Sequence, residues 1–489
     1  MRAKIKALQA QSAPIQPNDQ QRKQWQAQVD AYAHAFLEKI GERLCFNETE
    51  DLAQGLLDFP IEETAKELTS ILEVLEQNVD TPGLDPCSGG HMAYIPGGGL
   101  FPAALGDFLA AITNRYAGIF FSNPGAVRME NMLIRWMCDL IGFPQTALGN
   151  LTSGGSIANL IAIVTARDAQ GIRSKTVEEA VIYLSHQAHH SVQKAIRIAG
   201  LNEARLHYLP VDDRFRLDAT ALEQAIQADR AAGLRPFLVI ASAGTTDVGA
   251  IDPLAKIARI AQDQNLWLHV DAAYGGFFIL TEEIKAQYRG IEQADSVTID
   301  PHKSLFMPYG SGAVLIKNVA ALKKTHYYFA NYMQDAMLED REPSPADLSP
   351  ELTKHFRGLR MWLPLQLYGV QAFRVALSEK IWLCRYFYEE IQKRGFKVGP
   401  YPELSVAIYR YVPPGGRAAN AFNAQIIQAM RADGRIYLTS TTIDGVYWLR
   451  IAVLHYRTHL EEIDLCLQLL EEKVRELLKE DHKKSTSTA

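Results

Sequence analysis

The chain has 489 residues, of which 47% are hydrophobic and 22% charged, a composition typical of water-soluble globular proteins. Its net charge of −6 and its pI near 6.1 argue against a broad basic face for nucleic acid or a membrane surface. The length exceeds that of one simple core and predicts two or three domains.

The spacing of the cysteines and the length of the apolar runs indicate which cell compartment and which metal sites the chain is suited to. No two of the five cysteines have the Cys-x-x-Cys spacing, so neither a zinc site nor a disulfide framework is predicted. Residues 1–28 lack the apolar stretch of a secretory signal, and the longest apolar runs are too short to span a bilayer. We therefore expect a cytoplasmic protein whose thiols are reduced, at Cys45, Cys87, Cys138, Cys384 and Cys466.

Helical segments are expected first along the chain. Apolar residues recur at helical spacing, with few breakers, over residues 21–57 and 61–78. Proline and glycine then interrupt the pattern between residues 82 and 99. We interpret residues 1–90 as a helical segment that precedes the main body and is too small for a core of its own.

The middle of the chain alternates between helix-like stretches and short apolar runs. Short strands separated by helix-length segments predict an α/β domain over residues 91–365, with a mainly parallel central sheet and helices on both faces. Ligands of such sheets bind beyond the carboxyl ends of the strands. Helices are predicted at residues 105–114, 126–141 and 157–169, and strands at residues 180–184, 206–209, 237–241, 266–270, 297–299 and 312–316.

The pattern changes again toward the C-terminus. A long helical stretch at residues 360–394 is followed by short strands at residues 405–411 and 447–453 and by a helix at residues 459–478. This order predicts a small α+β domain over residues 366–489.

Lys303 stands just after the predicted strand at residues 297–299, which Pro301 ends because proline cannot continue a central strand. An amine removed from water at a strand end has its lone pair free to attack a carbonyl, which indicates Schiff-base chemistry. The alternative is an ordinary surface lysine, since most of the 50 lysines and arginines are solvated. Residues at the other strand ends decide between the two.

Small residues at 152–156 precede the predicted helix at residues 157–169. The backbone N–H groups of Gly155 and Ser156 can approach an anion closely, and the helix dipole adds to the attraction. A simple helix cap at Ser156 is the alternative. The run matches neither a P-loop nor the Gly-x-Gly-x-x-Gly dinucleotide motif.

Asp271 and His189 also follow predicted strands. A carboxylate at the end of an apolar strand is costly unless it is paired, so Asp271 is suited to a protonated heterocycle, or else to a turn or cap. His189 is either structural or suited to stack on a ring. Three histidines within residues 186–190 are also compatible with a metal site. We set that alternative aside because no acidic or cysteine ligand lies nearby.

Thr246 follows the strand at residues 237–241, either as a turn former or as a contact for an anion or a ring. Taken together, the strand ends offer a phosphate cradle, an imidazole, a carboxylate and a lysine amine. One cofactor needs this combination: pyridoxal 5′-phosphate, with its phosphate, its pyridine nitrogen and its aldehyde.

From about residue 86 to residue 457 the chain resembles the group II pyridoxal-phosphate-dependent amino-acid decarboxylases. This family has fold type I and includes the aromatic-L-amino-acid, histidine and glutamate decarboxylases. The strongest resemblance lies in His269-Val270-Asp271-Ala272-Ala273-Tyr274 and in Asp300-Pro301-His302-Lys303. Gln187-Ala188-His189 and Gly244-Thr245-Thr246 come in the expected order, and the segment at residues 356–362 is similar to the one after the family's mobile loop.

The resemblance implies a role for each strand-end residue. Lys303 carries the Schiff base with the cofactor, and Asp271 pairs with the pyridine nitrogen. His189 stacks on the ring and orients the substrate carboxylate. The remaining phosphate and ring contacts fall to Gly155, Ser156, His302, Thr246 and Ala273.

The resemblance also implies substrate contacts and a partner. Tyr94 and Pro96 match positions that line the side-chain pocket in members acting on aromatic amino acids. Arg450 matches an arginine that contacts the substrate carboxylate, with a salt bridge as the alternative. The family forms homodimers with active sites at the interface and exchanged N-terminal helices, so we expect a homodimer here.

We therefore predict α-decarboxylation of an L-amino acid, with an aromatic or other apolar side chain favoured, to the amine and CO2. The family's loop tyrosine returns a proton to Cα, but residues 335–347 contain no tyrosine and Tyr332 lies slightly upstream. In some members, loss of that tyrosine accompanies oxidative deamination to an aldehyde, which stays an alternative. An aminotransferase or lyase reaction and a non-catalytic binding protein are further alternatives.

Overall fold

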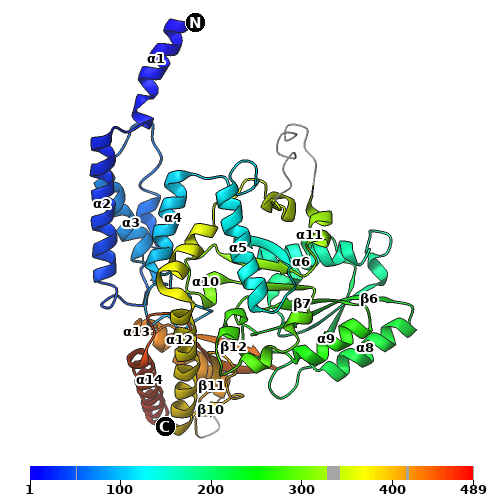
Figure 1. Ribbon diagram of the computed structural model, residues 1–489. Helices are drawn as coiled ribbons and strands as arrows, with labels where there is room; N and C mark the ends of the chain where they lie inside the picture. The colour runs from blue at the N-terminus through cyan, green and yellow to red at the C-terminus, as the bar shows by residue number, and fades with distance from the viewer. Residues whose placement is uncertain (51, 328–341, 415–417, 488–489) are drawn as a thin grey trace.

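A central β-sheet organises the middle of the chain. The computed structural model describes residues 1–50, 52–327, 342–414 and 418–487 (Figure 1). In that part of the chain the sheet has seven strands in the order β3-β9-β8-β7-β6-β4-β5. Neighbouring strands are parallel, except that β9 runs antiparallel to β3 and β8, which confirms the expected mainly parallel sheet. The strands are β3 (Leu148–Thr152), β4 (Ala180–Ser185), β5 (Arg205–Leu209), β6 (Arg235–Ser242), β7 (Trp267–Asp271), β8 (Ser296–Ile299) and β9 (Gly312–Ile316).

Strand β3 is the one member of this sheet that the sequence pattern did not predict. Its centre contains glycine and asparagine and lacks the β-branched residues typical of buried strands. All its residues are buried nonetheless. Asn150 tolerates burial because its side-chain amide donates to the carbonyl of Pro345 and accepts a hydrogen bond from Lys354.

Helices cover both faces of the sheet, so its central strands are buried throughout. Figure 1 shows α6 and α11 above the sheet and α8 and α9 below it. The predicted helices at residues 126–141 and 157–169 correspond to α5 and α6. The helices around the sheet are α5 (Pro124–Leu140), α6 (Gly155–Ala169), α7 (His190–Ile198), α8 (Ala219–Ala231), α9 (Leu254–Asp263), α10 (Pro301–Ser304) and α11 (Val319–His326).

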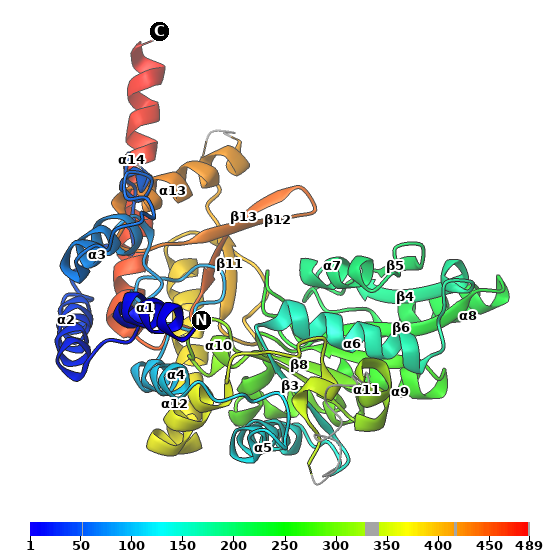
Figure 2. The same ribbon diagram turned by 90° about the horizontal axis from the view of Figure 1, so that it is seen from above.

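The N-terminal segment is helical, but its helices are shorter than expected. They are α1 (Arg2–Ser12), α2 (Asp19–Glu38) and α3 (Leu68–Leu75). The helix predicted at residues 105–114 corresponds to α4 (Phe101–Thr113), which begins four residues earlier than expected. The helix expected over residues 21–57 ends at Glu38, and the chain turns through Gly41 into strand β1 (Phe46–Asn47), which pairs with β2 (Gly83–Leu84). The described helices α1, α2 and α3 contain no buried residue. Figure 2 shows α2 and α3 on the outer side of the molecule, away from the sheet.

The C-terminal part forms a second, smaller sheet with its own core. Within the described residues this sheet has the order β10-β11-β13-β12 and is antiparallel. The predicted boundary at residue 365 falls inside α12, which bends at Gly369, where φ is 68°. No helix in the described part is long and apolar enough to cross a membrane. The elements are α12 (Gly358–Lys393), β10 (Lys397–Val398), β11 (Val406–Arg410), α13 (Ala419–Asp433), β12 (Thr439–Ile443), β13 (Val446–Ala452) and α14 (Leu460–Ser487).

Candidate active site

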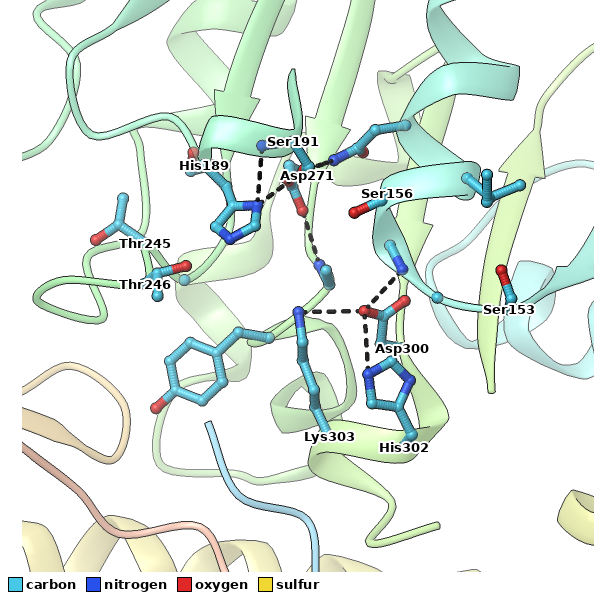
Figure 3. Close-up of a pocket in the computed structure, with 18 of the residues that line it drawn as sticks. Ser153, Ser156, His189, Ser191, Thr245, Thr246, Asp271, Asp300, His302 and Lys303 are labelled. Atoms are coloured by element: carbon cyan, nitrogen blue, oxygen red, sulfur yellow. Dashed lines mark hydrogen bonds and ion pairs between the residues drawn. The ribbon is translucent and has the colours of Figure 1, made fainter. Parts of the chain in front are cut away.

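A cavity of about 410 Å³ lies at the carboxyl ends of β3, β4, β6, β7 and β8. Figure 3 shows Lys303 reaching into it from α10, with Asp271 and His189 across from it and Ser153 and Ser156 to one side. Every cofactor residue expected from the sequence lines this cavity. These residues are Gly155, Ser156, His189, Thr246, Asp271, Ala273, His302 and Lys303.

Lys303 lies in the single turn of helix that follows β8. Pro301 opens this turn at a position where a missing N–H costs nothing. The Nζ atom of Lys303 is 3.1 Å from Oδ2 of Asp300, whose side chain is only 1% exposed. Asp300 was missed as a site residue, although the rule applied to Asp271, a carboxylate at the end of a buried strand, also fits it.

Asp300 also meets the turn between β3 and α6. Its Oδ2 atom accepts a hydrogen bond of 3.1 Å from the backbone N–H of Gly155. A Cβ atom on Gly155 would lie 2.8 Å from that oxygen, and one on Gly312 would lie 2.6 Å from the backbone of Gly154. The glycines therefore allow the backbone to approach closely, and the N-terminus of α6 faces the cavity as an anion site.

His302 lies on the wall of the same cavity. Its Nδ1 atom contacts the carbonyl of Ser311 at 2.5 Å, so this nitrogen carries a proton and donates it. Burial is the main cause that lowers the pKa of His302, which keeps the ring neutral near pH 7. The Nε2 atom of the neutral ring lies 3.9 Å from Asp300.

Asp271 ends β7 and is nearly buried, with 7% of its surface exposed. One carboxylate oxygen accepts from the backbone N–H of Ala273 at 3.1 Å. The other accepts from the side-chain amide of Asn159 at 2.9 Å. The carboxylate thus has two donors from the protein, and it lines the cavity where a cationic group can meet it.

His189 caps the N-terminus of α7. Its Nδ1 atom lies 2.8 Å from the hydroxyl of Ser191 and 3.3 Å from the backbone nitrogen of the same residue. Burial is the main cause that lowers the pKa of His189, so its imidazole is neutral near pH 7.

Three expected substrate residues do not line the cavity. Arg450 is 3% exposed, and its guanidinium donates to the carbonyls of Thr246 and Tyr94, at 2.6 and 2.7 Å from Nη2. Tyr94 is half exposed and has a positive φ of 54°. The segment carrying Tyr94 and Pro96 passes close to the site, because a Cβ on Gly97 would lie 2.2 Å from the carbonyl of His302. Tyr332 lies outside the described residues.

The side chains around the cavity fit pyridoxal 5′-phosphate. An amine, a carboxylate, a neutral imidazole and a helix N-terminus surround one space. Gln187 adds an independent sign of a ligand, because its Oε1 atom is buried on the cavity wall without a hydrogen-bond partner among the described residues. Within those residues, no group of three or more His, Cys, Asp or Glu side chains is arranged to hold a metal ion.

Comparisons with known proteins agree with this chemistry. The model of the pyridoxal-dependent decarboxylase conserved domain matches residues 50–411. An aromatic-L-amino-acid decarboxylase from Bacillus atrophaeus is 33% identical over 418 residues, which cover 84% of this chain and 87% of the relative. A phenylacetaldehyde synthase from Petunia hybrida is 29% identical over 430 residues, with 83% of each chain covered. The crystal structure of Oryza sativa TDC with PLP and tryptamine has a TM-score of 0.88 at 22% identity and covers 94% of this chain and 99% of its own.

Proposed function

The chain belongs to the pyridoxal-dependent decarboxylases, and we propose that it removes the α-carboxylate of an aromatic L-amino acid as CO2 and releases the amine. It is a carboxy-lyase that uses pyridoxal 5′-phosphate. The observation that carries the proposal is the single cavity shared by Lys303, Asp271 and His189. The aromatic side chain is proposed from the activities named for its relatives.

We propose these roles for the cavity residues. Bound pyridoxal 5′-phosphate supplies an aldehyde for the substrate amine and a ring that accepts the electron pair of the broken bond. Asp271 keeps a proton on the ring nitrogen, because a nearly buried carboxylate stabilises a cation beside it. Lys303 would offer its amine to the aldehyde, and Asp300, 3.1 Å away, would hold that amine in place as an ion pair.

The remaining roles concern orientation. We propose that the backbone at Gly155 and Ser156, together with His302, holds the phosphate at the N-terminus of α6. His189 would contact the bound ring and orient the substrate carboxylate, and Thr246 and Ala273 would also contact the cofactor. A fixed carboxylate would favour the loss of CO2 over other reactions, because the rate depends on how the reacting groups are oriented.

The side-chain pocket is proposed at Tyr94 and Pro96. Support comes from the passage of this segment against His302 and from the hydrogen bond of 2.7 Å that Arg450 donates to the Tyr94 carbonyl. The buried guanidinium of Arg450 holds the backbone of Tyr94 in its positive-φ conformation. The half-exposed ring of Tyr94 is thereby kept in one place, where it can contact an apolar substrate side chain.

We further propose a cytoplasmic homodimer. The described helices α1 to α3 contain no buried residue, and an α-helix without a buried face gains little from folding alone. Large apolar side chains are exposed on α2, α3 and α4, at Trp25, Val29, Ile71, Phe101, Leu105, Phe108 and Leu109. A second copy would cover them. All five cysteines are free thiols, which suits a reducing compartment. Sedimentation velocity at micromolar protein tests the dimer; a monomer with full activity would contradict it.

Substitution of Lys303 tests the reaction. Lys303→Ala should abolish turnover and the visible absorbance band of the bound cofactor, because Lys303 is the one lysine among the described residues that line the cavity. Lys317→Ala, on a lysine near the end of β9, is the control and should keep both. A panel of Trp, Tyr, Dopa, Phe, His, Glu and 2,4-diaminobutyrate, scored for CO2, identifies the side chain. Turnover that survives in Lys303→Ala would overturn the proposal.

An aldehyde-forming reaction is the second candidate. The observation behind it is the absence of tyrosine from residues 342–347, the described end of the segment expected to return a proton to Cα. The phenylacetaldehyde synthase among the relatives supports it in part. Parallel assays of CO2, amine, aldehyde and hydrogen peroxide separate the two: amine without peroxide supports decarboxylation alone, and aldehyde with peroxide supports the alternative.

A further inference from the structure

A chain of buried polar side chains runs behind the cavity and connects β7, β8, α6 and α7. Its members, in order of contact, are Trp267, Ser296, His269, Asn159, Ser191 and His189. The four central side chains are each at most 2% exposed. Buried donors and acceptors must be matched, so the hydrogen atoms along this chain can be placed from the chemistry of its members.

The amide of Asn159 has one possible orientation. The atom that lies 2.9 Å from Asp271 must be the Nδ2 donor, because a carboxylate accepts hydrogen bonds and does not donate them. The same Nδ2 atom lies 3.1 Å from the hydroxyl of Ser191 and donates its second hydrogen there. The Oδ1 atom of Asn159 is therefore an acceptor and faces Nε2 of His269, at 3.0 Å.

The far end of the chain agrees with this orientation. His269 has no exposed surface, and burial lowers its pKa to about 4, so the ring carries one proton near pH 7. That proton lies on Nε2, which leaves Nδ1 to accept from the hydroxyl of Ser296 at 2.9 Å. The indole N–H of Trp267, which can only donate, donates a hydrogen bond of 2.8 Å to the hydroxyl oxygen of Ser296.

The near end of the chain sets the proton on His189. The Ser191 oxygen already accepts from Asn159, so its own hydrogen is free to point to Nδ1 of His189, 2.8 Å away. The backbone N–H of Ser191 points to the same nitrogen at 3.3 Å. A nitrogen that faces two donors carries no proton. The single proton of the neutral ring is thus on Nε2, and Figure 3 shows the rest of the ring turned from Ser191 into the cavity.

We propose that Asn159 is a positioning residue of this site: one amide hydrogen holds the Asp271 carboxylate, and the other, through Ser191, keeps the proton of His189 on Nε2. One side chain thereby fixes both groups that face a bound cofactor ring, a carboxylate acceptor and an N–H donor. The inference rests on the proposed roles of Asp271 and His189 and is independent of the substrate.

Asn159→Asp is the sharpest variant, because it keeps the shape and the acceptor toward His269 but removes both donors. Protein labelled with 15N-histidine in a deuterated background reports tautomers through long-range 1H–15N spectra, and His189→Gln assigns the signal. We expect the apoprotein to show His189 protonated on Nε2, and Asn159→Asp to lose that pattern. The variant should also bind pyridoxal 5′-phosphate at least about tenfold more weakly, since a hydrogen bond to a charged group is lost.

Trp267→Phe is the matched control. It removes the donor at the far end of the chain and leaves Asn159, Asp271 and Ser191 intact. The His189 tautomer and the cofactor affinity should stay unchanged, because Asp271 and not the indole sets the amide orientation. Asn159→Ala removes the donors without adding a charge and replaces Asn159→Asp if the latter does not fold.

Two results would overturn the inference. One is a wild-type apoprotein with the His189 proton on Nδ1. The other is an Asn159 variant that keeps both the wild-type tautomer and the wild-type affinity. The tautomer is read without turnover, so an error in the proposed reaction would leave this test decisive, and a failed test would leave the decarboxylation untouched.

Discussion

The amine of Lys303 and the carboxylate of Asp300 form an ion pair of 3.1 Å across the single turn of α10. The same carboxylate oxygen accepts from the backbone N–H of Gly155, at the start of α6. One buried anion thus contacts both the amine proposed to react with the cofactor and the helix N-terminus proposed to hold its phosphate.

Removal of that negative charge should speed cofactor binding. In Asp300→Asn, the Lys303 ammonium loses its counter-charge and the phosphate no longer meets an anion at the helix N-terminus. We expect the apoprotein to bind pyridoxal 5′-phosphate roughly tenfold faster at pH 7, measured by stopped-flow absorbance. Asp213→Asn, on an exposed aspartate, is the control and should bind at the wild-type rate. Slower binding by Asp300→Asn would contradict this reading.

Lys354 and Glu130 form a fully buried ion pair of 2.6 Å. Lys354→Met would leave the Glu130 carboxylate buried without a cation, and we expect the free energy of unfolding to fall by about 3–5 kcal/mol. Adding Glu130→Gln should recover part of the loss, because a neutral amide still accepts from the backbone N–H groups of Arg357 and Gly358. Urea unfolding measures both effects. Lys393→Met, at an exposed pair, should change nothing measurable, and an equal loss there would refute the argument.

His455 should make the folded protein sensitive to acid. Its Nε2 donates to the carbonyl of Pro86 and its Nδ1 accepts from the backbone N–H of Arg457, an arrangement that a second ring proton would break. Burial lowers its pKa from 6.5 to about 3. Between these values the unfolded chain binds a proton and the folded chain does not, so stability falls as the pH falls.

His455→Gln should therefore reduce the dependence of the unfolding free energy on pH by about 1.4 kcal/mol per pH unit within that window. Chemical unfolding at several pH values between 4 and 7 measures the slope. His34→Gln, at an exposed histidine, is the matched control and should leave the slope unchanged. An unchanged slope in His455→Gln would show that the imidazole stays accessible to protons.

Arg450 should act on substrate binding through the two carbonyls it holds. In Arg450→Gln, the segments at Tyr94 and Thr246 lose the donor that they share. An amine product and a carboxylate-bearing substrate analogue should then both bind more weakly, and their inhibition constants should rise by the same factor, about tenfold. Arg410→Gln, on the neighbouring strand β11, should leave both constants unchanged. Weakening confined to the carboxylate compound would instead favour direct contact between Arg450 and the substrate.

The strand ends of the central sheet could be predicted because their signals are local. Apolar β-branched runs, followed by proline, glycine or a lone polar residue, mark each position within a few residues of the chain. Lys303, Asp271 and His189 could therefore be found as candidates without any knowledge of their neighbours. Their convergence on one cavity follows from parallel strands that end on one side of a sheet.

Contacts between distant segments could not be predicted in this way. Asn150 lies in a buried strand because Lys354 and Pro345 meet its amide from about 200 residues away. Asn159 reads as an ordinary polar residue in a helix, and its importance depends on Asp271 and His269, which lie on β7. The one signal in the sequence was a polar side chain among the apolar residues of α6. That signal indicates a role only when the partners of Asn159 are known.

The position of β3 at the edge of the sheet has a consequence for protein synthesis. Among the residues described, it pairs with β9 alone, which the ribosome makes roughly 160 residues later. At the usual speed of translation of about 5–20 residues per second, β3 is therefore complete about 10–30 s before the strand that it pairs with. An exposed strand edge can pair with the wrong partner during that interval, so we expect a shortage of chaperones to lower the yield of folded protein.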